Sequence, residues 1–236
     1  MTANAKLIVD RWDTDTHEDF RHSNLGYSRF CRALIDNRLQ PGMTLTQTQL
    51  SEALDISLSP LRETLVLLEE YGLVEIRQRS GIRIFYPEVS FIRENMQFRS
   101  IIEVSAMPVF FRNVREDWIT DMRSRHLSLQ AKWSAVKHDR DDELEYESQL
   151  LDRRFHASIV EALSNDAVQS THERINQNVH LARKVHQTSF GKEHFVDTID
   201  EHLVVIDGVE AGDLSVAVAA LEAHFRTATH RLFIAP

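Results

Sequence analysis

The order of segments between residues 34 and 86 constrains the fold more than any other feature of this chain. Two stretches with the apolar spacing of helices are joined by a tight turn, and two short alternating stretches follow, with Gly81 at their bend. Helix, turn, helix and then a two-stranded hairpin is the order of a winged helix-turn-helix, which lays one helix in the major groove of DNA. We therefore expect a DNA-binding domain over residues 23–87, because Pro87 breaks the strand pattern.

Local signals support this prediction. Thr46, with Gln49 at the third following position, forms a capping-box pattern that starts one helix. Ser57 or Ser59 is expected to cap the following helix, the recognition helix, and Gly72 to end it.

Arg62 lies in the first turn of the predicted recognition helix, where an arginine can contact a guanine bidentately or bind a phosphate. The alternative is a solvated surface residue, paired with Asp55 or Glu63. The complete helix-turn-helix-wing order favours the contact with DNA.

Charge is the main argument against a nucleic-acid partner, because the formal net charge of the chain is -9. Residues 23–87 carry as many arginines as acidic residues, so the excess of acid lies elsewhere. Overall acidity limits non-specific affinity but is compatible with a dimer that reads a defined site. No apolar run approaches the roughly 20 residues that span a bilayer. The polar arm over residues 1–22 is not a secretory signal, so a cytoplasmic protein without a membrane partner is expected.

The chain changes character after a short linker at residues 88–91. Long helical patterns then dominate, at 91–114, 116–138, 141–164, 167–188, 195–210 and 213–233. Six or seven helices with short connections predict an antiparallel bundle over residues 92–236. The expected fold class is mainly α: a winged helix-turn-helix followed by an all-α bundle.

Four residues of the predicted bundle have the chemistry and spacing of metal ligands. Asp152 and His156 are four apart, which puts both side chains on one face of a helix. His202 and His224 lie about 10 and 12 residues from the bend near Gly212, at similar heights on an antiparallel helix pair. Three imidazoles and one carboxylate suit a divalent transition metal such as Zn, Ni or Mn, and leave room for water or an effector carboxylate.

The alternative is chance, because the chain has 12 histidines. An inward-facing histidine is more often a hydrogen-bonded core residue than a ligand. His180, His186 and His194 are alternative ligands or plain surface residues.

Residues 34–76 resemble the N-terminal domain of GntR-superfamily regulators. The shared features are the PG turn, a leucine-rich second helix, the block S-x-S-P-L-R-E-x-L and the run L-x-x-x-G-L-V into the wing. The resemblance implies that Arg62 contacts the operator and that the wing touches the minor groove or the backbone. The positions expected to bind DNA are Arg62, Ser57, Ser59, Thr48, Arg79, Gly81 and Arg83.

Two positions depart from that family pattern. Leu58 stands where the family usually has arginine, and Thr48 stands where a basic residue is common. Each good bidentate base contact is worth roughly 1–3 kcal/mol, so operator preference is altered or affinity is low.

Residues 92–233 resemble the FCD effector domain of the FadR-like subgroup of GntR regulators. The motifs that show this resemblance are D-x-x-x-H and the long block EH…GD…A…H. The resemblance implies that the metal helps to hold a small carboxylate, the effector. Arg99, in an Arg-x-x-x-Glu pattern with Glu103, pairs either with the anion of that ligand or with Glu103 itself. Two winged domains on a homodimer would read a pseudo-palindromic operator in double-stranded DNA.

Three other functions compete with a ligand-responsive regulator. A metal in a helical bundle activates water in some hydrolases, although no residue is identified here as a general base and an enzyme does not explain the winged module. A second alternative is a metal site with a purely structural role. A third is a regulator that has lost DNA binding, as Leu58 and Thr48 would indicate.

Overall fold

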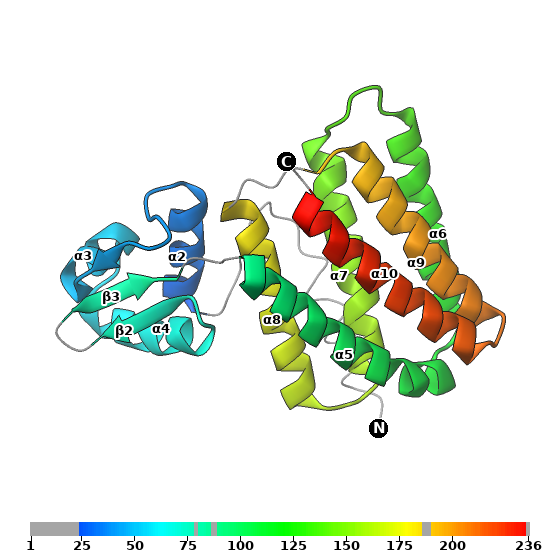
Figure 1. Cartoon of the computed structure of the whole chain (residues 1–236), viewed down its shortest axis with the longest axis horizontal. Helices are drawn as coiled ribbons and strands as arrows, with labels where there is room; N and C mark the ends of the chain where they lie inside the picture. Colours follow the sequence, from blue (N-terminus) through cyan, green and yellow to red (C-terminus); the bar gives the residue numbers. More distant parts are fainter. Residues whose placement is uncertain (1–23, 78–79, 86–88, 186–189, 235–236) are drawn as a thin grey trace. The chain divides into compact units, whose positions relative to one another are not determined.

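The computed structural model describes residues 24–77, 80–85, 89–185 and 190–234 (Figure 1). The chain divides into two compact units, residues 1–86 and 87–236, and each is described by itself. The expected N-terminal arm, residues 1–22, lies outside the described residues.

The described part of the first unit is a winged helix-turn-helix with a three-stranded antiparallel sheet. Its elements are α2 (Leu25–Ile35), β1 (Thr44–Leu45), α3 (Gln47–Leu54), α4 (Leu58–Glu70), β2 (Val74–Arg77) and β3 (Gly81–Ile84). The strand order is β1-β3-β2, with Thr44 opposite Arg83 and Val74 opposite Ile84. The predicted two-stranded hairpin is confirmed as β2 and β3, and β1 adds a third strand that the sequence did not predict. β1 has two residues, too few to show alternation of apolar and polar side chains.

The helix ends follow from local chemistry. The hydroxyl of Thr46 accepts a hydrogen bond from the backbone N–H of Gln49 (3.2 Å), and the Gln49 side chain accepts one from the N–H of Thr46 (2.9 Å). This capping box begins α3. Ser57 is the N-cap residue of α4, and Gly72 follows that helix with a φ of +70°, which glycine adopts without strain. The recognition helix α4 therefore lies where the sequence predicts it.

The second unit is all-helical within its described residues. Its helices are α5 (Val89–Asn113), α6 (Glu116–Ala135), α7 (Asp142–Glu161), α8 (Asp166–Val185), α9 (Lys192–Glu210) and α10 (Leu214–Ile234). Because α5 begins at Val89, most of the expected linker is helical, since residues 88–91 contain neither glycine nor proline. Among the described residues, no helix is long and apolar enough to cross a membrane.

α7 occupies the middle of this helical unit. It packs against α5, α6 and α8, while α9 packs against α6 and α10, and α10 against α5 (Figure 1). The core between the helices includes the fully buried side chains of Trp133, Phe155, Ile206 and Leu221. Side chains on the inward faces of α7, α9 and α10 are thus directed into one interior.

α9 and α10 approach each other closely at Gly208. A Cβ atom at this position would lie 2.7 Å from the backbone nitrogen of Ala217, closer than two such atoms can pack. The next helix begins at once, because Oδ1 of Asp213 accepts hydrogen bonds from the backbone N–H groups of Ser215 (3.0 Å) and Val216 (3.1 Å). The glycine and the cap together set the relative heights of α9 and α10.

Substitution of Gly208→Ala tests this close crossing. Helix propensity alone favours alanine by up to about 1 kcal/mol. The clash with the Ala217 backbone opposes this gain, and overpacking typically costs about 1–3 kcal/mol. We expect a lower free energy of unfolding, measured by urea denaturation with circular dichroism.

Val204→Ala is the matched control, because Val204 lies on the same helix and is 50% exposed. Its effect should stay within about 0.5 kcal/mol. A Gly208→Ala variant more stable than the wild type would show that α9 and α10 do not meet closely at this point.

Candidate metal centre and DNA-binding face

Four side chains from three helices converge inside the helical unit. Asp152 and His156 come from α7, His202 from α9 and His224 from α10, and one ligand atom of each lies within 4.8 Å of all the others. Nε2 of His156 is 3.5 Å from Oδ1 of Asp152, and Nε2 of His202 is 3.7 Å from the same oxygen. The three histidines are buried, and the Asp152 side chain is 33% exposed. The structure thus brings together all four residues that the sequence spacing singled out.

Carboxylates fix the rings of His156 and His224. Nδ1–H of His156 donates to Oε2 of Glu103, a residue of α5 with no exposed surface. Nδ1–H of His224 donates to Oε2 of Glu201 at 2.8 Å. In both rings the proton on Nδ1 leaves the lone pair on Nε2, the nitrogen available to the cluster.

His202 reaches the same tautomer through a second histidine. Nδ1 of His126, on α6, is 2.7 Å from the carbonyl oxygen of Met122, which only accepts, so this nitrogen carries a proton. Nε2 of His126 then accepts the proton of His202 Nδ1 at 3.1 Å. Nε2 of His202 therefore also keeps its lone pair. Nε2 of His156 and Nε2 of His202 are buried and have no hydrogen-bond partner within the described part of the chain.

Burial keeps most of these imidazoles neutral. It lowers the pKa of His202 well below the ordinary value, and the neighbouring His224 and His156 lower it further. Burial also lowers the pKa of His224 and of His126. Neutral rings at physiological pH are the form that binds a metal ion.

Nearby charges outweigh burial in setting the pKa values of Asp152 and His156, the two cluster residues on α7. Burial disfavours the Asp152 carboxylate, but His156 and Arg99 outweigh it and hold the pKa of Asp152 well below its usual range. Burial and Arg99 lower the pKa of His156, yet the carboxylates of Glu103 and Asp152 outweigh them, so the net pKa is raised. A cation is therefore favoured between these two carboxylates, either a proton on His156 or a metal ion.

Arg99 makes one of the two contacts that the sequence left open, the ion pair with Glu103. Its Nε donates to Oε1 of Glu103 (2.7 Å), which also accepts from Nε2 of His172 (2.8 Å). Its Nη2 lies 3.8 Å from Oδ2 of Asp152 and, among the described residues, has no hydrogen-bond partner. Nε of Arg99 is thus held by Glu103, while its Nη2 lies beside the cluster without a hydrogen-bond partner among the described residues.

Sequence reasoning missed the partners that orient the cluster. These residues are His126, His172 and Glu201, together with the role of Glu103. Glu103 and Glu201 had sequence signals, the spacing of Glu103 from Arg99 and the place of Glu201 in the EH motif, whereas His126 and His172 reach the cluster from separate parts of the chain.

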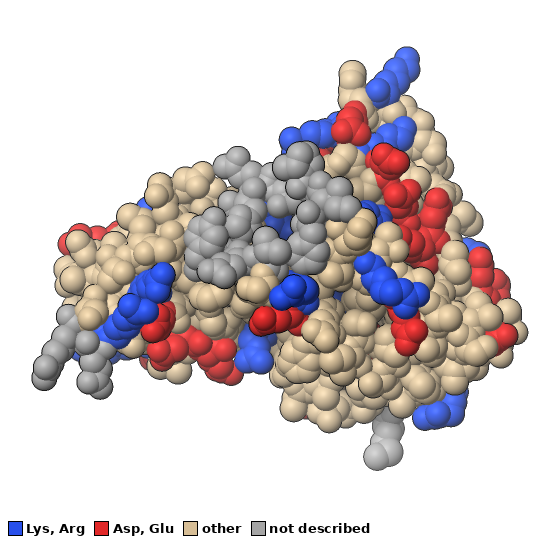
Figure 2. Space-filling model, viewed as in Figure 1, with Lys and Arg blue, Asp and Glu red and all other residues tan. Residues whose placement is uncertain are grey.

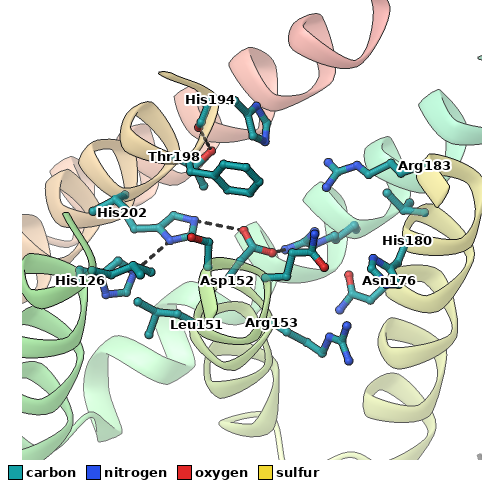
Figure 3. Close-up of a pocket in the computed structure, with 17 residues that line it drawn as sticks. His126, Leu151, Asp152, Arg153, Asn176, His180, Arg183, His194, Thr198 and His202 are labelled. Carbon is teal, nitrogen blue, oxygen red and sulfur yellow. Dashed lines mark hydrogen bonds and ion pairs between the residues drawn. The ribbon is translucent and has the colours of Figure 1, made fainter. Parts of the chain in front are cut away.

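A cavity opens beside the cluster (Figure 3). Its volume is about 70 Å³, counted as the space that the centres of water molecules can occupy. Such a volume holds roughly five water molecules, enough for a small organic acid. In Figure 3, Asp152 lies between His202 on one side and Arg183, His180 and Asn176 of α8 on the other.

The alternative histidine ligands fall outside the four-residue cluster. His180 and His194 line the cavity instead. His186 lies outside the described residues.

The residues of α3, α4 and the turn between them that are expected to bind DNA are exposed on the first unit. Ser57, Ser59 and Arg62 lie together at the start of α4, and Thr48 lies in the first turn of α3. Arg62 forms no ion pair among the described residues, whereas Asp55, its expected alternative partner, contacts Arg29.

The wing supplies a second set of positions. Gly81 begins β3 with a φ of +98°, and a Cβ there would lie 2.7 Å from the carbonyl oxygen of Leu45. Arg83 is exposed on the same strand, while Arg79 lies outside the described residues. Gly81 therefore has a structural role in the hairpin that is separate from any contact with DNA.

Other arginines of this unit serve the fold. Nη1 of Arg38 donates to the carbonyl oxygen of Ala53 (2.9 Å), and Arg77 pairs with Glu75 (2.8 Å). Figure 2 shows basic and acidic side chains interspersed over the face that it draws. The charge on this surface is therefore mixed, in agreement with the neutral balance of residues 23–87.

Comparisons with known proteins agree in fold. The chain is 24% identical over 200 residues to the uncharacterized HTH-type transcriptional regulator YdhC of Bacillus subtilis, which covers 84% of this chain and 85% of that protein. McbR/YncC of E. coli has a TM-score of 0.65 at 15% identity, covering 90% of this chain and 98% of the other. Lar of Listeria monocytogenes has a TM-score of 0.62 at 16% identity, covering 91% and 98%. At these identities the two structures establish a common fold.

Family profiles establish more than the fold. Residues 27–84 match the bacterial regulatory proteins of the gntR family, and residues 94–227, more than half of the chain, match the FCD domain. The chain therefore belongs to the GntR family of bacterial regulatory proteins, as a transcriptional regulator with a DNA-binding helix-turn-helix and an FCD domain.

Proposed function

We propose that the protein is a ligand-responsive regulator in which Asp152, His156, His202 and His224 hold a divalent transition metal. A small organic acid binds beside the metal and changes the affinity of a homodimer for DNA. The DNA is a pseudo-palindromic operator, read by two winged units that are related by a two-fold axis. Such a regulator works in the cytoplasm, where it meets the operator.

One observation carries the metal assignment. Each of the three histidines gives its Nδ1 proton to a different acceptor, namely Glu103, His126 and Glu201, so that all three Nε2 lone pairs remain for the interior. A hydrogen-bonded core histidine has no need of such an arrangement. Partners that hold the far nitrogen of a ligand histidine are the usual outer shell of a metal site in a protein.

The donor set restricts the metal. Three imidazole nitrogens and one carboxylate suit Zn, Ni or Mn better than Mg or Ca, which prefer all-oxygen ligands. An ion that accepts more than four ligands keeps places for water or for a carboxylate of the effector. Nη2 of Arg99, which lies next to Asp152, is the donor that would bind the same carboxylate.

The ligand would act by linking helices. An acid bound to the metal and to Arg99 contacts α5 directly, and contacts α7, α9 and α10 through the metal ligands. It shifts the regulator only as far as its affinity differs between DNA-compatible and DNA-incompatible dimers. A metal site with a purely structural role would leave operator binding unchanged on addition of any organic acid.

The start of α4 is the part proposed to read the operator. The Ser57 side chain makes no cap hydrogen bond, and its hydroxyl is exposed beside Ser59 and Arg62. Backbone N–H groups at a helix N-terminus also favour a phosphate. Further contacts with DNA would come from Thr48 and from the wing residues Arg79, Gly81 and Arg83.

Substitution of His156→Ala or His224→Ala should remove the bound metal, because each variant lacks one of the four ligands. Elemental analysis of the purified protein measures the metal per chain. His230→Ala is the matched control, since His230 lies on α10 as His224 does but is exposed. Unchanged metal content in both ligand variants would eliminate the proposed centre.

His126→Phe should weaken metal binding without changing the ligands themselves. Phenylalanine has a similar shape but cannot accept the Nδ1 proton of His202. Loss of an outer-shell partner typically lowers metal affinity by roughly 10–100-fold. Competition with a chelator measures the change, while saturating metal should still give the wild-type stoichiometry. An unaltered affinity would mean that His126 does not orient His202.

Arg62→Ala should abolish specific operator binding. The lost contact is worth roughly 1–3 kcal/mol in each half-site, so a dimer loses it twice. Fluorescence anisotropy would compare an operator, found by selection from genomic fragments, with unrelated DNA of equal length. Arg226→Ala, at an exposed arginine of α10, is the control and should bind like the wild type. Retained specificity in Arg62→Ala would place recognition elsewhere.

A further inference from the structure

The cavity beside the proposed metal centre extends to a second cation. Arg183 comes from α8 and lines the cavity together with Asp152, Asn176 and His194. Figure 3 shows its side chain on the side of Asp152 that is opposite His202. The proposed metal site uses only one end of this cavity, so the other end needs an explanation of its own.

Arg183 forms no ion pair among the described residues. Its Nε is buried without a hydrogen-bond partner, and its guanidinium carbon lies 5.3 Å from the centre of the Phe190 ring. Burial lowers the pKa of Arg183 to about 10, and Arg99 and Arg231 act in the same direction, whereas the Asp152 carboxylate raises it. The group remains charged at neutral pH. A guanidinium with a buried nitrogen and no ion pair is unusual, because desolvation of an unpaired charge costs several kcal/mol.

Two polar atoms nearby are also unsatisfied. Nδ1 of His194 and Oδ1 of Asn176 are buried and, within the described residues, have no hydrogen-bond partner. Burial and Arg183 lower the pKa of His194 to about 3, so this imidazole is neutral. Native interiors pair nearly all buried polar atoms, and a group of unpaired ones around one cavity indicates a polar ligand.

The charges in the cavity indicate the ligand class. Arg99 and a divalent metal at one end would attract one carboxylate. That carboxylate would leave Arg183, at the other end, without an ion pair. A monoanion would therefore pair with only one of the two cationic ends of the cavity.

We propose that the effector carries two anionic groups, and that Arg183 binds the second one while the metal and Arg99 hold the first. Arg183 then decides between dianionic and monoanionic acids of the same length. This inference rests on the proposed metal-dependent effector site, and it adds the chemical class of the ligand. His194 and Asn176 would contact polar groups between the two anions.

The experiment compares matched acids on the metal-loaded, full-length protein. Isothermal titration calorimetry would measure malate against 2-hydroxybutyrate and 2-hydroxyglutarate against 2-hydroxyvalerate, each pair having equal carbon chains but different charge. We expect at least one dianion to bind more tightly than its monoanionic partner. In Arg183→Gln its affinity should fall by about 30-fold or more, since a buried charge pair loses one member. The affinity for the monoanions should stay within about three-fold of the wild type, a difference too small to reflect a lost ion pair.

Controls separate this inference from the proposed function. Arg183→Gln should keep the wild-type metal content, because Arg183 is not among the four proposed ligands, and Arg226→Gln should behave like the wild type throughout. A wild-type protein that takes up no metal contradicts the proposed function and this inference with it. A metal-loaded wild type that binds no dianion better than its monoanionic partner contradicts this inference alone. An Arg183→Gln variant that retains full preference for the dianion does so as well.

Discussion

The buried carboxylate of Glu103 is the constraint on which the helical unit most depends. It has no exposed surface and accepts hydrogen bonds from Arg99, His156 and His172, which come from three different helices. An unpaired carboxylate in the interior would cost several kcal/mol, so α5, α7 and α8 must pack where their donors reach it. The same bonds orient His156 toward the other proposed ligands. The registration of three helices and the geometry of the candidate centre therefore have one physical cause.

Polar groups in this unit fall into two classes that differ in pairing. Around the proposed metal, every far nitrogen of a ligand histidine has a partner, so the rings are held in place before any ion arrives. Along the cavity, four donors and acceptors lack a hydrogen-bond partner within the described part of the chain, namely Nη2 of Arg99, Nε of Arg183, Nδ1 of His194 and Oδ1 of Asn176. The proposed metal centre beside unsatisfied polar atoms would suit a ligand-responsive regulator, because the ligand would supply the missing interactions and thereby gain differential affinity.

Much of the fold could be predicted from local sequence signals. Thr46, Gln49 and Gly72 define their helix ends through short-range hydrogen bonds or a left-handed backbone, which depend on a few neighbouring residues. Prediction failed where the element had too little sequence of its own. β1 spans two residues and exists because β3 pairs with it, and the expected linker continues into α5 because nothing in it breaks a helix.

The sequence by itself determined the winged helix-turn-helix, the helical domain and the four-residue cluster. Asp152 and His156 share a helix face through their spacing, and the distances of His202 and His224 from one bend place them at similar heights. Only the tertiary structure decided which side chains surround the cluster, namely His126, His172, Glu201 and Arg183. The physical reason is range. Helical periodicity and caps act over a few residues, whereas these contacts depend on the packing of helices that lie far apart along the chain.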